Sequence, residues 1–191
     1  MLSRVLLVLA LTALLADVAL GQPADWFSTV REGSVEDLRV ALVAGANVHA
    51  RDEGGRTPLV YAASNANLSV LLLPLGAGTV IEAHDHLGWT PLVTAILFSE
   101  NPDAVRVLLD AGANLEAGDV FGSTPLMHAA SDDDPDAVRL LLAAGAGLGV
   151  RDATGMTPLM HAASGGFPDV VQVLLDAGLH SKPVTSPVRR H

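Results

Sequence analysis

Two clusters of acidic and histidine side chains have the donor types of a metal site. His84-Asp85-His86 places two imidazoles beside a carboxylate, but no second motif such as HExxH or CxxC accompanies it. Residues 132–136 read Asp-Asp-Asp-Pro-Asp, and they lack the alternating Asp-x-Asp-x-Asp-Gly loop and the distal Glu of a calcium site. A helix N-terminus capped by Asp134 explains this second cluster without an ion. We therefore expect no metal ion at either cluster.

Two further histidines, His128 and His161, could form a catalytic or metal-binding pair. They lie in the identical segments Thr-Pro-Leu-Met-His-Ala-Ala-Ser that begin at Thr124 and Thr157, so sequence repetition accounts for their equivalent places. The chain has neither a GxSxG nucleophile motif nor a GxxxxGK[ST] phosphate-binding loop. It also has no cysteine, which excludes thiol nucleophiles and thiolate metal sites. We therefore predict no catalytic residue, no cofactor and no enzyme activity.

The composition limits the class of partner. The formal net charge is -10 and the pI is about 4.9, which argues against nucleic acid because a nucleic-acid-binding surface is basic. Only 4% of the residues are aromatic while 50% are hydrophobic, so the apolar content is mostly Ala, Leu and Val. This composition favours closely packed helices over a large aromatic core.

The histidine segments belong to a repeat that runs through most of the chain. Threonines at the start of Thr-Pro-Leu are 33, 34 and 33 residues apart, and a fixed period of this size is typical of stacked supersecondary units. Each unit opens with Asp-x-x-Gly-x-Thr-Pro-Leu. The four aspartates are Asp52, Asp85, Asp119 and Asp152, and the four threonines are Thr57, Thr90, Thr124 and Thr157.

The repeated residues predict a turn followed by two helices. Asp and Gly favour a tight turn, Thr is a good helix N-cap, and Pro suits the first helical position. A second Pro announces the second helix in three units, which we expect to end at a glycine. These prolines are Pro102, Pro135 and Pro168, and the glycines are Gly112, Gly145 and Gly178.

A divergent first unit precedes these four. We expect a short helix over residues 25–31, closed by Gly33 as a left-handed cap, and a second helix over residues 35–44 with Ser34 as its N-cap. This unit has no Thr-Pro-Leu segment, as expected for a terminal repeat.

The chain resembles the ankyrin repeat family from about residue 24 to 179. Turn, caps, two helices and the exit segment of residues 111–117 recur in the family's order. The resemblance implies an all-α, ankyrin-type solenoid of about five helix-turn-helix repeats, with projecting β-hairpin-like loops and a concave binding face. The expected domain covers residues 22–180, followed by a flexible tail at 181–191. Its repeats lie at about 24–51, 52–84, 85–118, 119–151 and 152–180.

The chain departs from the family pattern in three ways. The family usually has His directly after Thr-Pro-Leu, whereas this chain has Val or Met there and two histidines one residue later. Pro74 falls inside a second helix, so we expect residues 70–77 to be kinked or broken. The last unit keeps the apolar face of an internal repeat, which a solenoid end normally covers. Residues 181–191 are too short and proline-rich for another helix pair, so either they lie over this face or something else covers it.

Residues 1–21 have the organisation of a secretory signal peptide. Arg4 gives a positive start, residues 5–16 contain no charge, and small residues precede the expected cleavage after Gly21. An uncleaved membrane anchor is the alternative, but a span needs about 20 apolar residues and Asp17 comes too early for that. We expect export, to a bacterial periplasm or as a secreted protein, since the Ala-, Leu-, Asp- and Val-rich composition favours a bacterium.

The positions beside the turn glycine and at the end of the first helix line the concave face by resemblance. Several carry large apolar residues that the repeat does not require: Leu87, Trp89, Phe98, Phe121 and Met156. We interpret Trp89 and Phe121 as binding anchors, although packing between neighbouring loops would also explain them. The polar residues expected around them are Arg56, His86 and Asp132.

These observations predict a non-enzymatic scaffold that binds a partner protein through its concave face. In a periplasm, such a protein could stabilise or inhibit an enzyme, or act as an immunity protein against a toxin. The alternative is a structural protein that self-assembles, for example as a homodimer, through its last repeat.

Overall fold

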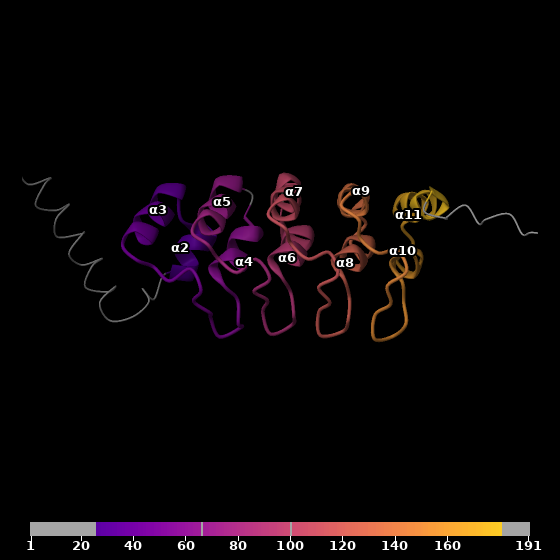
Figure 1. Ribbon diagram of the computed structural model, residues 1–191, viewed down its shortest axis with the longest axis horizontal. Coiled ribbons are helices and arrows are strands. Elements are labelled where there is room, and N and C mark those ends of the chain that lie inside the picture. The colour runs from indigo at the N-terminus through magenta and orange to yellow at the C-terminus, as the bar shows by residue number, and fades with distance from the viewer. Residues whose placement is uncertain (1–25, 66, 100, 181–191) are drawn as a thin grey trace, which may run out of the picture. The chain divides into compact units, whose positions relative to one another are not determined.

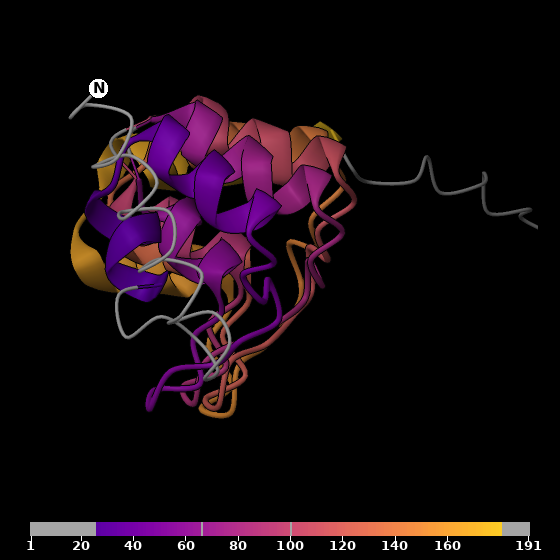
Figure 2. The same cartoon turned by 90° about the vertical axis from the view of Figure 1, so that its left-hand side faces the viewer.

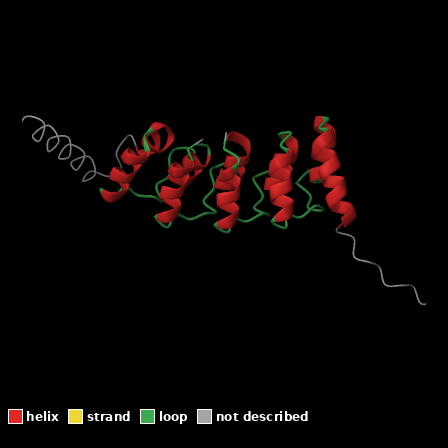
Figure 3. Ribbon diagram, turned by 90° about the horizontal axis from the view of Figure 1, so that it is seen from above, coloured by secondary structure: helices red, strands yellow, loops and turns green. Residues whose placement is uncertain are grey.

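The computed structural model describes residues 26–65, 67–99 and 101–180 of the chain (Figure 1). It divides into two compact units. The described residues up to 113 form the first unit, and those from 114 onwards form the second. Within the described ranges there are ten helices and no strand (Figure 3), which confirms the expected all-helical fold. The expected signal peptide and the tail at 181–191 lie outside the described residues. None of the helices in the described ranges has the length and apolar character needed to cross a membrane.

The first unit contains three helix pairs. Their first helices, α2, α4 and α6, pack against one another in order, and so do the second helices, α3, α5 and α7. The bounds are α2 Trp26–Glu32, α3 Val35–Val43, α4 Pro58–Ala63, α5 Leu68–Gly76, α6 Pro91–Phe98 and α7 Asp103–Asp110. Most of α4 and α6 is buried, because each lies between neighbouring pairs.

The second unit contains two helix pairs built in the same way. Helix α8 packs on α10 and α9 packs on α11, while each first helix also contacts its own second helix. The bounds are α8 Pro125–Ser131, α9 Pro135–Ala143, α10 Pro158–Gly165 and α11 Pro168–His180. The repeat boundaries assigned from the sequence stay a prediction.

The threonine caps form as expected in three of the four regular repeats. The hydroxyls of Thr57, Thr90 and Thr157 each accept a hydrogen bond from the backbone N–H three residues later, at 3.4 to 3.5 Å. Thr124 has the same extended backbone, but its buried hydroxyl has no hydrogen-bond partner among the described residues. Its N–H instead donates to Met127 Sδ at 3.4 Å. Thr124 is still the N-cap of α8, as expected, and the helix begins directly after it.

A hairpin-like loop precedes each regular helix pair (Figure 2). In each loop the turn Asp N–H donates to the carbonyl four residues later, at 3.1 Å. The glycine between them has a φ of 75 to 83° in all four loops, a conformation that side chains with a Cβ disfavour. These turns are the hairpin-like loops expected from the sequence.

Two glycine expectations are wrong. Gly33 is outside the left-handed region; a side chain there would instead collide with the backbone of Thr29, because the chain turns back closely on α2. Helix α11 does not end at Gly178 but continues to His180. Glycine inside a helix costs only about 1 kcal/mol relative to alanine, so Gly178 alone does not stop the helix.

Pro74 does not break its helix. Helix α5 runs without interruption from Leu68 to Gly76 with Pro74 inside it, so the expected break in residues 70–77 is not found. Pro74 has no N–H to donate to the carbonyl of Val70, but both side chains are buried. Packing of this apolar helix therefore compensates for the missing hydrogen bond, and the expected kink stays a prediction.

Candidate functional site

The turn aspartates position the candidate binding residues. One carboxylate oxygen of each turn Asp accepts hydrogen bonds from the N–H groups two and four residues later. Five of the eight candidate residues lie at these two offsets: Arg56, Leu87, Trp89, Phe121 and Met156. The same carboxylate that forms the loop therefore fixes the backbone from which these side chains project.

In the first unit the apolar candidates gather around one ring pair. Trp89 packs on Phe98 with ring centroids 5.6 Å apart and planes tilted by 42°. Trp89 is half-buried, whereas Phe98 is 53% exposed and Leu87 is 45% exposed. Trp89 is thus held in place by Phe98, and both Phe98 and Leu87 present apolar surface to solvent. We call Leu87, Trp89 and Phe98 the first-unit aromatic cluster.

In the second unit Phe121 projects from a hairpin tip. Its side chain is 65% exposed, and its carbonyl accepts a hydrogen bond from Ala153 N–H in the next loop at 2.9 Å. The two loops of this unit are thus tied together beside the exposed ring. Met156 lies in the second of these loops and is half-buried.

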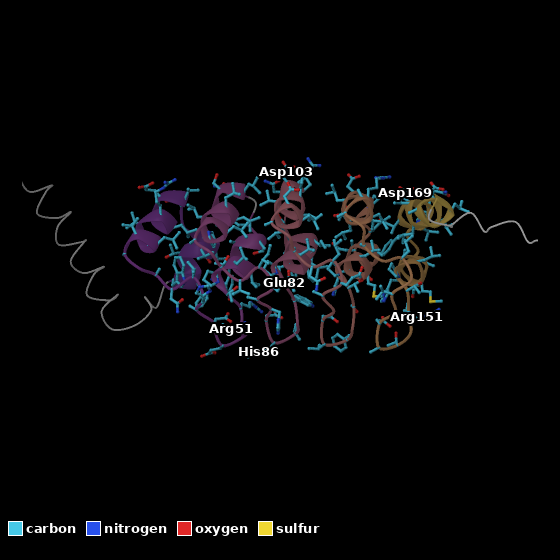
Figure 4. The ribbon with its side chains drawn as sticks, viewed as in Figure 1. Arg51, Glu82, His86, Asp103, Arg151 and Asp169 are labelled. Carbon is cyan, nitrogen blue, oxygen red and sulfur yellow. The ribbon has the colours of Figure 1, made fainter. Side chains whose placement is uncertain are left out.

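The expected polar residues have different surroundings. Arg56 Nε lies 3.8 Å from Asp85 Oδ2, and its guanidinium lies over the Tyr61 ring at 5.8 Å. His86 is exposed on its hairpin (Figure 4), and its N–H donates to the Gly54 carbonyl of the preceding loop at 2.9 Å.

Asp132 follows α8 in the second unit and is exposed. Partial burial of its carboxyl, followed by the nearby charge of Asp134, raises the pKa of Asp132.

A second function of the turn aspartates was not foreseen from the sequence. Their other oxygen bonds the side chain nine residues later: Tyr61 Oη donates to Asp52 Oδ2 at 2.7 Å, and histidine Nε2 lies 3.1 and 2.8 Å from the carboxylate in the two loops of the second unit. These histidine pairs are Asp119–His128 and Asp152–His161. The nine-residue spacing between Asp and a polar ring is the sequence signal that could have identified them.

The third repeat breaks this pattern. Thr94 stands nine residues after Asp85, and its hydroxyl is buried without a hydrogen-bond partner among the described residues. Asp85 Oδ2 instead faces Arg56 of the preceding loop. A short side chain does not reach the carboxylate, so the neighbouring repeat supplies the positive partner.

The pKa values of Asp52 and His128 reflect these contacts. Burial acts to raise the pKa of Asp52, but hydrogen bonds from Tyr61 and from backbone N–H groups outweigh it, so the pKa is lowered. Burial also lowers the pKa of His128, even though Asp119 opposes that shift. His128 therefore favours its neutral form, and its contact with Asp119 is a hydrogen bond more than an ion pair.

One group in the second unit has the residue types of a hydrolytic triad. His161 lies between Asp152 and the hydroxyl of Ser131, with Nδ1 3.2 Å from Ser131 Oγ. However, Ser131 is the last residue of α8 and donates to the Met127 carbonyl at 2.9 Å. A helix C-terminus presents carbonyls, whereas an oxyanion needs N–H donors. The group therefore links two helices more readily than it performs acyl transfer.

The clusters first considered for metal binding have other partners. Asp85 forms its turn, and Asp134 caps α9 by accepting from the N–H groups of Asp136 and Ala137 at 3.0 and 2.8 Å. Across the described ranges, no group of three or more His, Asp or Glu residues is placed to hold a metal ion.

Comparison with known protein families gives one clear similarity. A family model described as ankyrin repeats (3 copies) matches residues 27–119 and again residues 100–183. Together these matches cover most of the chain. A comparison with curated proteins gave no match.

Proposed function

Because the chain belongs to the ankyrin repeat family, whose repeats generally mediate protein–protein interaction, we propose that it is an exported, non-enzymatic scaffold that binds a partner protein. Recognition uses the hairpin loops and the ends of the first helices. Binding either stabilises or inhibits the partner.

The observation that carries this proposal is the first-unit aromatic cluster. The Trp89 and Phe98 rings pack together with centroids 5.6 Å apart, and Phe98 is 53% exposed. They form a rigid apolar surface that helix packing leaves partly exposed to solvent. Aromatic side chains supported by neighbours are typical centres of binding energy. Since the turn Asp already fixes the backbone of Leu87 and Trp89, little conformational entropy is lost on binding. Arg56 and His86 supply polar groups in the same unit.

Phe121 is a second anchor, proposed for the second unit on its own evidence. It is the most exposed aromatic residue of the described chain, and its loop is tied to the next one. Asp132 and Met156 belong to the surface proposed for this unit.

The test is affinity capture from the native extract, followed by titration of the captured protein. We expect Phe98→Ala and Phe121→Ala each to weaken binding by at least about 30-fold, the effect of losing a hot-spot residue. Val80→Ala is the matched control, because Val80 is exposed but lies in the segment after α5 and not at a hairpin tip. Unchanged circular dichroism would confirm that each variant folds. Equal binding by the wild type and both aromatic variants would contradict this surface.

Export is proposed from the positive start, the uncharged run and the small residues before Gln22. N-terminal sequencing of the native protein should find Gln22 first. An intact Met1 would contradict export by cleavage.

Self-assembly through the last repeat is the second candidate. Met127 and Met160 occupy the same place in identical segments, yet Met127 is 0% exposed and Met160 is 45% exposed. Leu175 and Leu179 of α11 are exposed as well. Sedimentation of the mature chain beside Leu179→Asp tests this: a wild-type dimer that the variant loses supports self-assembly, and a wild-type monomer at all concentrations contradicts it.

A further inference from the structure

We propose that His161 is a pH-sensitive clamp that, in its protonated form, holds the last helix pair, α10 and α11, against α8. The proposal concerns the second unit alone and is independent of partner binding. It rests on a chain of hydrogen bonds that crosses from one repeat to the next.

This series of hydrogen bonds begins at the turn carboxylate and ends at a helix carbonyl. His161 Nε2 lies 2.8 Å from Asp152 Oδ2, and His161 Nδ1 lies 3.2 Å from Ser131 Oγ. The Ser131 hydroxyl lies 2.9 Å from the Met127 carbonyl, to which it donates. His161 belongs to α10, whereas Ser131 and Met127 belong to α8. The imidazole is therefore the bridge between the two repeats.

The protonation state of His161 decides how many of these bonds can form together. A backbone carbonyl only accepts, so Ser131 must use its single hydrogen to bond Met127. Its oxygen then needs a donor from His161 Nδ1, while the carboxylate of Asp152 needs a donor from Nε2. Only the imidazolium carries both hydrogens. Neutral His161 must give up the Asp152 bond, the Nδ1 contact or the Ser131–Met127 bond.

The Asp152 carboxylate, at the start of this series of hydrogen bonds, keeps its charge over the pH range considered. The hydroxyl of Thr154 is the main cause that lowers the pKa of Asp152, and the N–H groups of Met156 and Thr154 and the His161 ring add to it. Asp152 is thus ionised throughout the range of about pH 5 to 8. The ion pair is lost by deprotonation of the imidazole.

One titratable neighbour of His161 is itself a histidine, and its positive charge would repel that of His161. His128 on α8 interacts electrostatically with His161, and burial lowers the pKa of His128, which favours its neutral form. Asp119 and Asp132 face His128.

The acidic residues of α11 belong to a different surface. Asp169 and Asp176 line a groove together with Arg139 of α9, and His161 is not part of that lining. Asp152 is therefore the carboxylate in hydrogen-bond contact with the clamp.

His128 serves as an internal control, because the residue that corresponds to Ser131 one repeat earlier is not a serine. Ser131 stands seven residues after Thr124, and the residue seven after Thr90 is Leu97, which has no hydroxyl. His128 contacts the turn carboxylate of Asp119, and the sequence has no serine at the equivalent place one repeat earlier. The complete Asp–His–Ser arrangement thus belongs to the junction between the fourth and fifth repeats.

The sign of the effect follows from these contacts. Asp152 and His161 belong to the same repeat, so their contact does not depend on docking. The bond from His161 Nδ1 to Ser131 crosses to α8, and protonated His161 can form it without losing the Asp152 or Met127 bonds. Docking of the last helix pair is therefore strongest at the acidic end of the histidine range, and the extra stability is lost as the proton leaves at higher pH. Above that range α10 and α11 open more often, while α8 and α9 are unaffected.

Amide hydrogen exchange of the full chain, corrected for intrinsic rates, tests the clamp. We expect the protection of α10 and α11 to fall about tenfold relative to α8 and α9 between about pH 5 and 8, because charged hydrogen bonds contribute on that scale. His161→Gln should abolish this pH dependence. Ser131→Ala should reduce it by removing the acceptor at Nδ1, and His128→Gln should leave it unchanged.

Three results would overturn the proposal. They are a flat wild-type profile, an undiminished profile in His161→Gln, or a Ser131→Ala profile identical to that of the wild type. Nitrogen chemical shifts of His161 provide a second readout, which reports its protonation even if a variant folds poorly. A His161 ring that stays neutral at the acidic end of the range would also rule the clamp out.

Discussion

At the scale of the residue, each turn Asp serves two structural purposes. One oxygen binds the N–H groups that close the hairpin, and in three repeats the other oxygen binds a ring nine residues later. A single carboxylate thus connects the loop that carries the candidate binding residues to the first helix. Replacing one of these aspartates would disturb the loop and the helix together.

The Asp152 loop gives a pH prediction whose sign can be worked out. The Thr154 hydroxyl donates to Asp152 Oδ1 at 2.7 Å and is the largest cause of the lowered pKa of Asp152. A lowered carboxyl pKa contributes stability above the unfolded value of about 3.9, and this stability is lost as the pH falls through the folded value. Thr154→Ala should therefore be less stable than the wild type near neutral pH, with a difference that shrinks in acid.

Urea unfolding from about pH 3 to 6 measures this difference across the carboxyl range. Thr154→Ser keeps the hydroxyl and is the control, expected to follow the wild type. A Thr154→Ala deficit that is the same at every pH would show that the hydroxyl acts through packing and not through the charge of Asp152.

The sequence revealed these residues as a pattern but not as partners. Asp152 and His161 were recognisable as repeat positions, yet their hydrogen bond depends on how the hairpin returns over α10. His161 meets Ser131 across 30 residues, a contact that depends on the stacking of helix pairs. Local propensity carries no information about such contacts, whereas the turn glycines and helix caps follow from local chemistry and were predictable.

At the scale of the element, helix beginnings were more predictable than helix ends and interiors. Four regular first helices begin at the Pro after the capping Thr, because both residues act within one turn. The end of α11 and the unbroken course of α5 were missed, since glycine and proline only weaken a helix. Packing against α9 and α10 in one case, and against α3, α4 and α7 in the other, outweighs those costs.

Two identical helices in different surroundings provide a test of packing. Met127 is fully buried in α8, whereas Met160 in α10 is 45% exposed. We expect Met127→Ala to reduce the free energy of unfolding by about 2–4 kcal/mol, because it leaves a cavity. Met160→Ala should cost less than about 1 kcal/mol, as expected for a partly exposed side chain.

Urea denaturation of both variants at low protein concentration gives these two values. Equal costs would mean that Met160 is covered in solution. If its cost rises with protein concentration, a second copy of the chain provides the cover, which would favour self-assembly.

At the scale of the whole molecule, repeat proteins derive stability from each pair and its nearest neighbours. The repeats at the C-terminal end are closest to one another in sequence, and the second pair contains Pro74 within α5. The first pair lacks the Thr-Pro-Leu cap altogether. Against this, the last pair leaves Met160, Leu175 and Leu179 exposed. The end that opens first therefore depends on which feature costs more stability: the unfavourable local sequence of the first two pairs, or the uncovered apolar side chains of the last pair.

We expect opening to begin at the N-terminal side. An interior proline costs about 3 kcal/mol, whereas three partly exposed side chains forfeit only part of their burial energy. Amide hydrogen exchange should be measured at the acidic end of the histidine range, where His161 is expected to hold α10. Amides of α2, α3 and α5 should then exchange before those of α8 and α10. Uniform protection would contradict this order, and faster exchange in α10 and α11 would show that the uncovered face of the last repeat determines where the molecule opens.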